Sequence, residues 1–266
     1  MNGSSRSIAI KKNIIASLFL KGISILVSLQ VVPLTINYIN PTRYGIWLTL
    51  SSIVAWLSYF DLGFAHGFRN RFAEAVAKGD MQLAREYVST TYVVLSLLFS
   101  SVFLIAIVVN HFVDWSAILN VDAAYSSELN IVFGILAFFF CLNIVASIFT
   151  TMLTANQKPA LASLIQTLGQ VFGFICIYIL TKTVPGNLDV LAFAFSGVPC
   201  FLLIIISIGM FLSGRYRHLS PSFHFVHFSL TKKIVGLGGQ FFIIMISMLF
   251  VFQLINIVIS RVAGPM

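Results

Sequence analysis

Long apolar stretches separated by short polar segments dominate the pattern of this sequence. A membrane-spanning helix needs about 20 predominantly apolar residues, and seven stretches reach that length. They cover residues 14–38, 45–66, 90–110, 129–153, 160–181, 188–213 and 234–262. The pattern therefore predicts an all-α integral membrane protein, folded as a polytopic helical bundle.

Composition and charge sharpen this prediction. Of 266 residues, 59% are hydrophobic and 9% are charged, and the mean hydropathy is +0.98. This balance excludes a soluble globular domain. The net charge of +8 does not indicate nucleic-acid binding, because the Lys and Arg residues gather in alternate loops. One side of the membrane receives Arg6, Lys11, Lys12, Arg69, Arg71, Lys78, Arg85, Lys158, Arg215, Arg217, Lys232 and Lys233. By the positive-inside rule this side and the N-terminus are cytoplasmic.

The first two apolar stretches each contain one charged residue. Lys21 and Asp61 both lie 20 residues from Pro41, where a short turn predicts an antiparallel hairpin. The two charges therefore lie at about the same depth in the membrane. An ionisable group in a membrane helix costs at least about 2.5–3.5 kcal/mol, so it usually faces the bundle interior and finds a partner. We predict that Lys21 and Asp61 form a pair.

Polar residues extend this pair along two helix faces. At 100° per residue, one face of the first helix carries Ser17, Lys21, Ser24, Ser28 and Thr35. One face of the second helix carries Trp47, Ser51, Ser58 and Asp61. Two interpretations are open: a structural ion pair with hydroxyls packing helix to helix, or a polar stripe that lines a substrate cavity. We favour the cavity, with candidate binding or coupling residues Lys21, Asp61, Ser24, Ser28 and Ser58.

The later stretches contain signals of helix packing. Asn143 shares a helix face with Ser147, and Gln166 shares one with Gln170. Such pairs are more often interhelical hydrogen bonds than ligands. Two further signals are the spacing of Gly169 and Gly173, which allows close helix approach, and Pro199, which predicts a kink.

Two polar segments allow simpler interpretations. Residues 69–88 are amphipathic and are interrupted at Gly79-Asp80, which predicts two short helices on the membrane interface or a solvated connector. In the sixth loop, His224 and His227 have no acid or cysteine nearby, so we expect no metal there. We expect no cofactor elsewhere.

The seventh stretch resembles the first, because each follows a basic segment and ends in a short motif containing proline. This weak repeat predicts two lobes related by an axis along the membrane normal. We expect a six-helix lobe over residues 1–213, a cytoplasmic basic loop over 214–233, and the first helix of an incomplete second lobe over 234–266. On that last helix, Gln253, Asn256 and Ser260 share one face, and Asn256 is a further candidate site residue.

Several motifs carry a resemblance to a known family. They are Asn40-Pro41-Thr42-Arg43-Tyr44-Gly45, Phe60-Asp61-Leu62-Gly63-Phe64, Gly67-Phe68-Arg69-Asn70-Arg71, Asn156-Gln157-Lys158 and Gly238-Gly239-Gln240-Phe241-Phe242. The chain resembles the O-antigen-type polysaccharide-repeat flippases of the multidrug/oligosaccharidyl-lipid/polysaccharide exporter superfamily. The resemblance implies a MATE-like N-terminal lobe of six helices and, in complete members, a second such lobe across a central cavity.

The resemblance also implies a function. The expected activity is alternating-access transport of undecaprenyl-diphosphate-linked oligosaccharide repeat units across the bacterial inner membrane, for O-antigen or related lipopolysaccharide synthesis. Implied partners are that lipid-linked oligosaccharide, membrane lipid, and the polysaccharide polymerase and chain-length proteins. Lys21 would bind the diphosphate, while Asp61 would position it or couple an ion. One alternative is a multidrug or cation antiporter of the same fold.

A membrane-embedded polysaccharide enzyme is the alternative from another class. Such chemistry needs convergent His, Asp or Arg groups near a membrane face. The predicted outer loops contain one histidine, His111, and no arginine beyond Arg43 and Arg261. We therefore expect a transporter and not an enzyme.

Overall fold

The fold is taken from a computed structural model, which describes residues 3–55, 63–119, 121–236, 239–240, 243 and 247. The described residues are almost entirely helical, and they contain no strand. Five helices are long and apolar enough to cross a membrane: Lys12–Ile39, Met81–Phe112, Ser126–Ala155, Pro159–Thr183 and Leu188–Leu212. The chain is therefore a multi-pass helical membrane protein, as the apolar pattern predicts.

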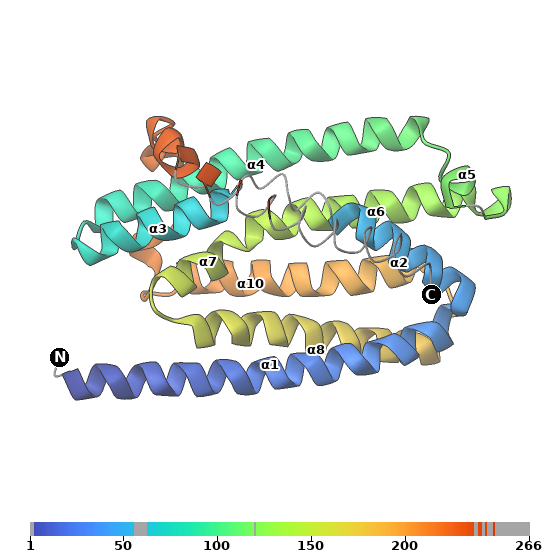
Figure 1. Cartoon of the computed structure of the whole chain (residues 1–266), viewed down its shortest axis with the longest axis horizontal. Helices are drawn as coiled ribbons and strands as arrows, with labels where there is room; N and C mark the ends of the chain where they lie inside the picture. The colour runs from blue at the N-terminus through green and yellow to red at the C-terminus, as the bar shows by residue number, and fades with distance from the viewer. Residues whose placement is uncertain are drawn as a thin grey trace, which may run out of the picture.

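The long helices lie side by side in one bundle (Figure 1). They are α1 (Gly3–Ile39), α4 (Met81–Phe112), α6 (Ser126–Ala146) with α7 (Ile148–Ala155), α8 (Pro159–Thr183), and α9 (Leu188–Ala192) with α10 (Val198–Leu212). Shorter elements are α2 (Pro41–Ala55), α3 (Phe64–Ala77), α5 (Trp115–Leu119), η2 (Ala123–Tyr125), η4 (Arg217–Leu219) and η5 (Phe223–Phe225). Between α9 and α10 the chain forms one π-helical segment, η3 (Phe193–Gly197).

Two of the seven expected spans fall partly outside the described residues. Within the expected span 45–66, α2 ends at Ala55 and α3 begins at Phe64 after a left-handed Gly63 (φ 74°), and residues 56–62 are not described. Of the span 234–262, the structure describes only residues 234–236, 239–240, 243 and 247. The expected division at 213 and 233 stays a prediction.

The first two helices meet at the turn that the sequence predicts and diverge from it over the described residues. α1 packs mainly along α8, whereas α2 packs on α6. The turn itself explains the divergence. Asn40 adopts a left-handed conformation (φ 73°) and its Oδ1 accepts a hydrogen bond from the Arg43 N–H at 3.0 Å. Arg43 then donates to the Gly186 carbonyl at 3.0 Å and pairs with Glu128 at 3.5 Å, which holds the start of α2 toward α6.

The amphipathic segment 69–88 differs from its prediction in one respect. Its break is where the sequence indicates, because Gly79 has a φ of 76° and Asp80 caps the next helix by accepting from the Leu83 N–H at 2.9 Å. The prediction of a second short interfacial helix is wrong, however, because the residues after the break are the first turns of α4, which runs to Phe112. Ala84 and Val88 are fully buried there, so this stretch packs inside the bundle.

Close packing of α8 and α10 matches the glycine spacing. A Cβ on Gly169 would lie 3.2 Å from the Pro199 Cβ, and one on Gly173 would lie 3.5 Å from the Pro199 Cγ. The π-helical segment η3 immediately precedes α10, and Pro199 lies in the first turn of α10; the predicted kink stays a prediction. Pro199 therefore lies at a close contact between α8 and α10.

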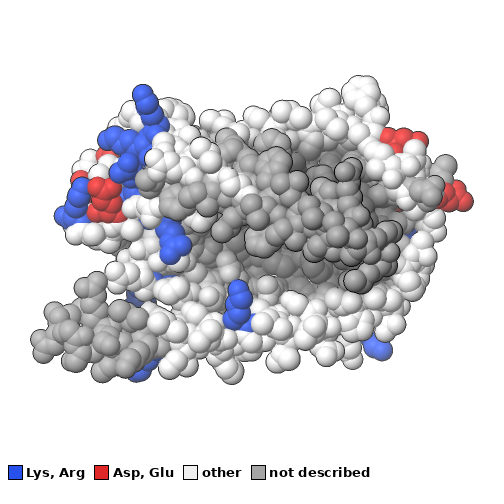
Figure 2. Space-filling view, in the orientation of Figure 1, with Lys and Arg blue, Asp and Glu red and all other residues white. Residues whose placement is uncertain are grey.

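Charged residues gather at the two ends of the bundle. Figure 2 shows Lys and Arg concentrated over α3 and the start of α4, and acidic side chains at the opposite end near α5. On α3, Glu74 pairs with Lys78 at 2.7 Å and with Arg71 at 3.0 Å. The hydrogen bond from Lys78, followed by that from Arg71, lowers the pKa of Glu74. The separation of charge fits helices that enter and leave a membrane at these ends.

Candidate functional site

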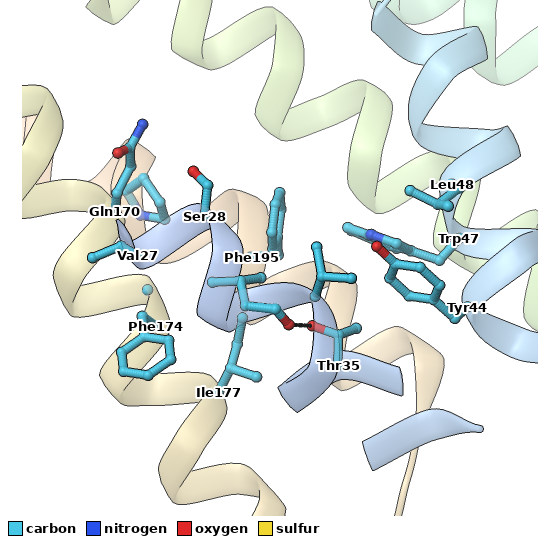
Figure 3. A pocket seen from close by; sticks show the side chains of 14 residues that line it. Val27, Ser28, Thr35, Tyr44, Trp47, Leu48, Gln170, Phe174, Ile177 and Phe195 are labelled. Carbon is cyan, nitrogen blue, oxygen red and sulfur yellow. Dashed lines mark hydrogen bonds between the residues drawn. The ribbon is translucent and has the colours of Figure 1, made fainter. Parts of the chain in front are cut away.

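A cavity of about 380 Å³ lies where α1 and α2 diverge. Figure 3 shows it surrounded by side chains of α1, α2, α8 and η3. Its walls are mostly apolar and aromatic: Val27, Val31, Val32, Tyr44, Trp47, Leu48, Phe174, Ile177, Phe195 and Pro199. We call this space the α1 chamber. A volume of this size is in the range of small-ligand sites, which are typically lined in this way.

Three polar side chains face the α1 chamber from two helices. Ser28 Oγ donates to the Ser24 carbonyl at 2.9 Å, and Thr35 Oγ1 donates to the Val31 carbonyl at 2.7 Å. Each hydroxyl proton is therefore used within α1, which leaves oxygen lone pairs as acceptors. Gln170 of α8 lies opposite Ser28 in Figure 3. Its side-chain amide makes no hydrogen bond to the described residues, so it offers both donors and an acceptor.

A second, smaller cavity of about 240 Å³ lies beyond one aromatic pair. Trp47 is 3% exposed and meets Phe195 edge to face, with ring centroids 5.2 Å apart. Trp47, Phe195 and Pro199 line both spaces, and the second space is completed by side chains of α2, α6 and η3. We call it the α6 chamber. Trp47 and Phe195 therefore form a partition between two chambers.

The α6 chamber has its own polar groups. Ser51 of α2, Asn143 of α6 and Ser196 of η3 face it. Ser51 Oγ is buried and has no hydrogen-bond partner among the described residues. The interhelical hydrogen bonds predicted for Asn143 and Gln170 find no support in the part of the chain that the structure describes. Gln170 lines the α1 chamber and Asn143 lines the α6 chamber.

Neither chamber is lined by a charged side chain from the described part of the chain. Lys21 is exposed on α1, seven residues and thus about two helical turns before Ser28, and it does not line either chamber. Asp61, Ser58 and Asn256 lie outside the described residues. The pairing of Lys21 with Asp61 and the roles of these residues therefore stay predictions.

The predicted polar stripe of α1 supports both interpretations, because one part of it packs against a helix and another part lines a chamber. Ser24 Oγ lies 3.1 Å from Thr167 Oγ1 of α8, so this hydroxyl packs helix against helix. Ser28 and Thr35 line the α1 chamber. The division follows from α8, which covers α1 at Ser24 and leaves its face open further along the chain. On α2, Trp47 and Ser51 both line a chamber, as their shared face predicts.

The sequence did not predict the partition between the chambers, nor the part that Phe195 has in it. Phe195 is one of 26 phenylalanines, and no local pattern distinguishes it. The only available signal was Pro199 four residues later, since proline and a π-helical segment both interrupt the regular hydrogen-bond ladder. Such segments occur frequently at functional sites, and η3 contributes Phe195 to both chambers and Ser196 to one.

A comparison with protein families gives one match. The model of the family described as "Polysaccharide biosynthesis protein" matches residues 10–266, which is nearly the whole chain. The match agrees with the resemblance carried by the turn motif at residues 40–45. No curated protein and no solved structure matches the chain.

Proposed function

Because the chain belongs to the polysaccharide biosynthesis protein family, we propose that it transports lipid-linked oligosaccharide repeat units across the bacterial inner membrane. The observation that carries this proposal is the pair of chambers separated by Trp47 and Phe195 inside the bundle. Alternating access of these chambers to the two membrane faces would pass a sugar chain from the inner to the outer leaflet. The protein would then be a flippase and not an enzyme.

The chemistry of the chambers suits a neutral oligosaccharide. A sugar ring has apolar C–H faces and a rim of hydroxyl groups. Trp47, Tyr44 and Phe195 offer aromatic surfaces for the ring faces. Hydroxyls on the rim would donate to the free lone pairs of Ser28 and Thr35, and the amides of Gln170 and Asn143 would both donate and accept. These amides stay solvated when the site is empty, so they carry no desolvation cost before the sugar binds.

The diphosphate of the substrate needs cations, and the described lining of the chambers contains none. We therefore place the diphosphate outside the two chambers. Lys21 lies on the α1 face that continues toward the basic end of the bundle, and we keep it as the proposed cation. Asp61 is the proposed group that positions Lys21 or couples an ion. A cation or multidrug antiporter would instead use Asp61 to bind the ion or the drug, and Asp61 lies outside the described residues.

The proposed orientation places the basic end of the bundle in the cytoplasm. This end contains α3 with Arg69 and Arg71, and the start of α4 with Arg85, whereas the other end contains α5 and the start of α6, with Asp114, Asp122 and Glu128 in or beside them. A retained excess of Lys and Arg on the cytoplasmic side is the usual determinant of topology. The polysaccharide polymerase and chain-length proteins would then act on the product at the acidic, outer end.

The test replaces the native gene by a variant in which Gln170→Leu and Asn143→Leu remove both chamber amides. We expect the lipid-linked repeat unit to be made and to accumulate on the cytoplasmic side, while surface polysaccharide falls at least tenfold. Leu104→Ala is the matched control, because Leu104 is 64% exposed on α4 and lines no described cavity. Membrane levels are compared by immunoblot.

Two results would overturn the proposal. If the double variant fails to make the lipid-linked repeat unit at all, the chain acts in its synthesis and is an enzyme. If surface polysaccharide stays normal at verified membrane levels, the chambers do not carry the sugar. Protection of the repeat unit from an impermeant lectin in spheroplasts separates accumulation on the inner side from accumulation on the outer side.

A further inference from the structure

A groove outside both chambers lies on the outer face of α4, near the basic end of the bundle. It has a volume of about 460 Å³ and is lined by Ser89, Tyr92, Val93 and Leu97 of α4 and by Pro221 and Phe223 of the loop after α10. Neither of the two chambers shares a lining residue with it. The groove therefore needs an occupant of its own.

The loop that forms one wall is fixed to α4 by hydrogen bonds. The Ser222 N–H donates to Ser89 Oγ at 3.1 Å, and the His227 N–H donates to Thr90 Oγ1 at 3.0 Å. Arg85, one turn earlier on α4, donates from Nε to the Ser220 carbonyl at 2.9 Å. Three contacts over one stretch of α4 hold the loop in place, so the groove is preformed.

The walls of the groove are apolar and open to the membrane. Phe223 is 88% exposed and Leu97 is 59% exposed, although both are large hydrophobic side chains. Further along the same helix, Leu104 and Val108 are also more than half exposed. In water such a surface would be unfavourable. Along a membrane-spanning helix it forms a track that a lipid acyl chain can follow from the groove toward the bilayer centre.

Positive charge lies beside the groove, because Arg85 is bonded to the carbonyl of Ser220, which precedes the lining residue Pro221. The Arg85 guanidinium lies 4.2 Å above the Phe225 ring, and within the described residues its terminal nitrogens donate no hydrogen bond. His224 adjoins Phe223 and is exposed. The acidic group on this side is Glu86, whose Oε1 lies 3.7 Å from His227 Nε2. A phosphate beside the groove would therefore meet Arg85 directly, whereas Glu86 already has a basic neighbour.

We propose that this groove is a binding site for an anionic phospholipid, with one acyl chain along α4 and the phosphate at Arg85. The opposite end of α4 provides the internal contrast. Phe112 is 80% exposed there and, like Phe223, adjoins an exposed histidine, His111, but the charged side chain next to it is the acidic Asp114 and not an arginine. The two ends of one helix thus differ in charge while both present an exposed phenylalanine.

The experiment uses that contrast in nanodiscs containing the purified chain. Phe223→Trp places a fluorophore in the groove, and Phe112→Trp places one at the other end of α4. Emission of the unaltered protein is subtracted, so the three native tryptophans cancel. Brominated phosphatidylglycerol and brominated phosphatidylcholine are then compared as quenchers at equal mole fraction. At position 223 we expect about fivefold preferential quenching by the anionic lipid, the effect of one cation at an anionic surface, and at position 112 a ratio near one.

Arg85 variants test the source of the preference. In the Phe223→Trp background, Arg85→Gln should reduce the ratio to near one while quenching by phosphatidylcholine persists, which shows that the loop still faces lipid. Arg85→Lys should keep the preference. A ratio near one at both positions, equal preference at both positions, or no quenching at position 223 would overturn the proposal. So would displacement of brominated phosphatidylglycerol by polyprenyl phosphate at equimolar amounts, because the occupant would then be a substrate carrier.

Discussion

The two chambers share a wall but differ in how their polar groups are satisfied. In the α1 chamber, the Ser28 and Thr35 hydroxyls already donate to carbonyls of their own helix. In the α6 chamber, Ser51 Oγ is buried without a hydrogen-bond partner among the described residues. The hydroxyls of the α1 chamber are thus satisfied within their own helix, whereas the α6 chamber contains a buried hydroxyl without a partner among the described residues.

Under the proposed function, this difference predicts distinct roles for the two spaces. A buried hydroxyl without a partner lowers stability by about 1–3 kcal/mol. Proteins retain such a group where it binds a ligand. The chamber with satisfied hydroxyls offers acceptors at no cost in stability. We infer that the α6 chamber discriminates more strongly between sugars, because an unsatisfied group rejects a substrate that leaves it unpaired. The predictions below are ordered from the largest expected effect to the smallest.

Removing the partition should have the largest effect. Trp47→Ala deletes a buried side chain that contacts Phe195 and joins the two chambers into one. We expect a loss of about 3–5 kcal/mol in the free energy of unfolding, as for other buried Trp or Phe truncations. The measurement is the unfolding transition of purified protein in detergent. Trp47→Phe keeps an aromatic ring at this position and should cost less than half as much.

The matched control for the partition is Leu104→Ala, a truncation on the exposed face of α4. Its expected change is within about 0.5 kcal/mol. If Trp47→Ala cost no more than Leu104→Ala, Trp47 would not pack as the structure shows, and the two chambers would be one continuous space.

Overpacking the contact between α8 and α10 should have an intermediate effect on stability. Gly169→Val places a branched side chain where even a Cβ would lie 3.2 Å from Pro199. Overpacking of this kind costs about 1–3 kcal/mol, and here it would push α10 away from α8 and displace η3. Gly209→Val on α10 is the control, because nothing lies within 4 Å of a Cβ at that position. Equal melting temperatures for the two variants would contradict the close approach of α8 and α10.

These elements show which parts of the fold the sequence could predict. Apolar length predicted the five described spans, and small-residue spacing predicted a close helix approach at Gly169 and Gly173, since both signals are local. The break at Gly79-Asp80 was also local and correct. The association of α1 with α8 and of α2 with α6 was not predictable, because it depends on contacts between Arg43, Gly186 and Glu128, which lie far apart in the sequence.

The candidate site was predictable only in part, for a similar reason. Helical periodicity placed Ser24, Ser28 and Thr35 on one face, but it could not show that α8 covers that face at Ser24. It also placed Trp47 beside Ser51 without revealing Phe195, which reaches Trp47 from η3. Periodicity identifies the face of a helix. The partner that covers the face depends on the packing of the whole bundle.

The smallest expected effects are changes in the free energy of unfolding that have opposite signs in the two chambers. Ser51→Ala removes the buried hydroxyl without a described partner, so the free energy of unfolding should stay unchanged or rise by up to about 1 kcal/mol. Thr35→Val removes a hydroxyl that donates to the Val31 carbonyl at 2.7 Å, and it should lower stability by about 0.5–1 kcal/mol. Both variants are measured by unfolding in the same detergent. Shifts of the same sign and size would show that the two chambers do not differ in this way. If the Ser51 hydroxyl serves a sugar, Ser51→Ala should also lower surface polysaccharide more than Thr35→Val, although it is the more stable protein.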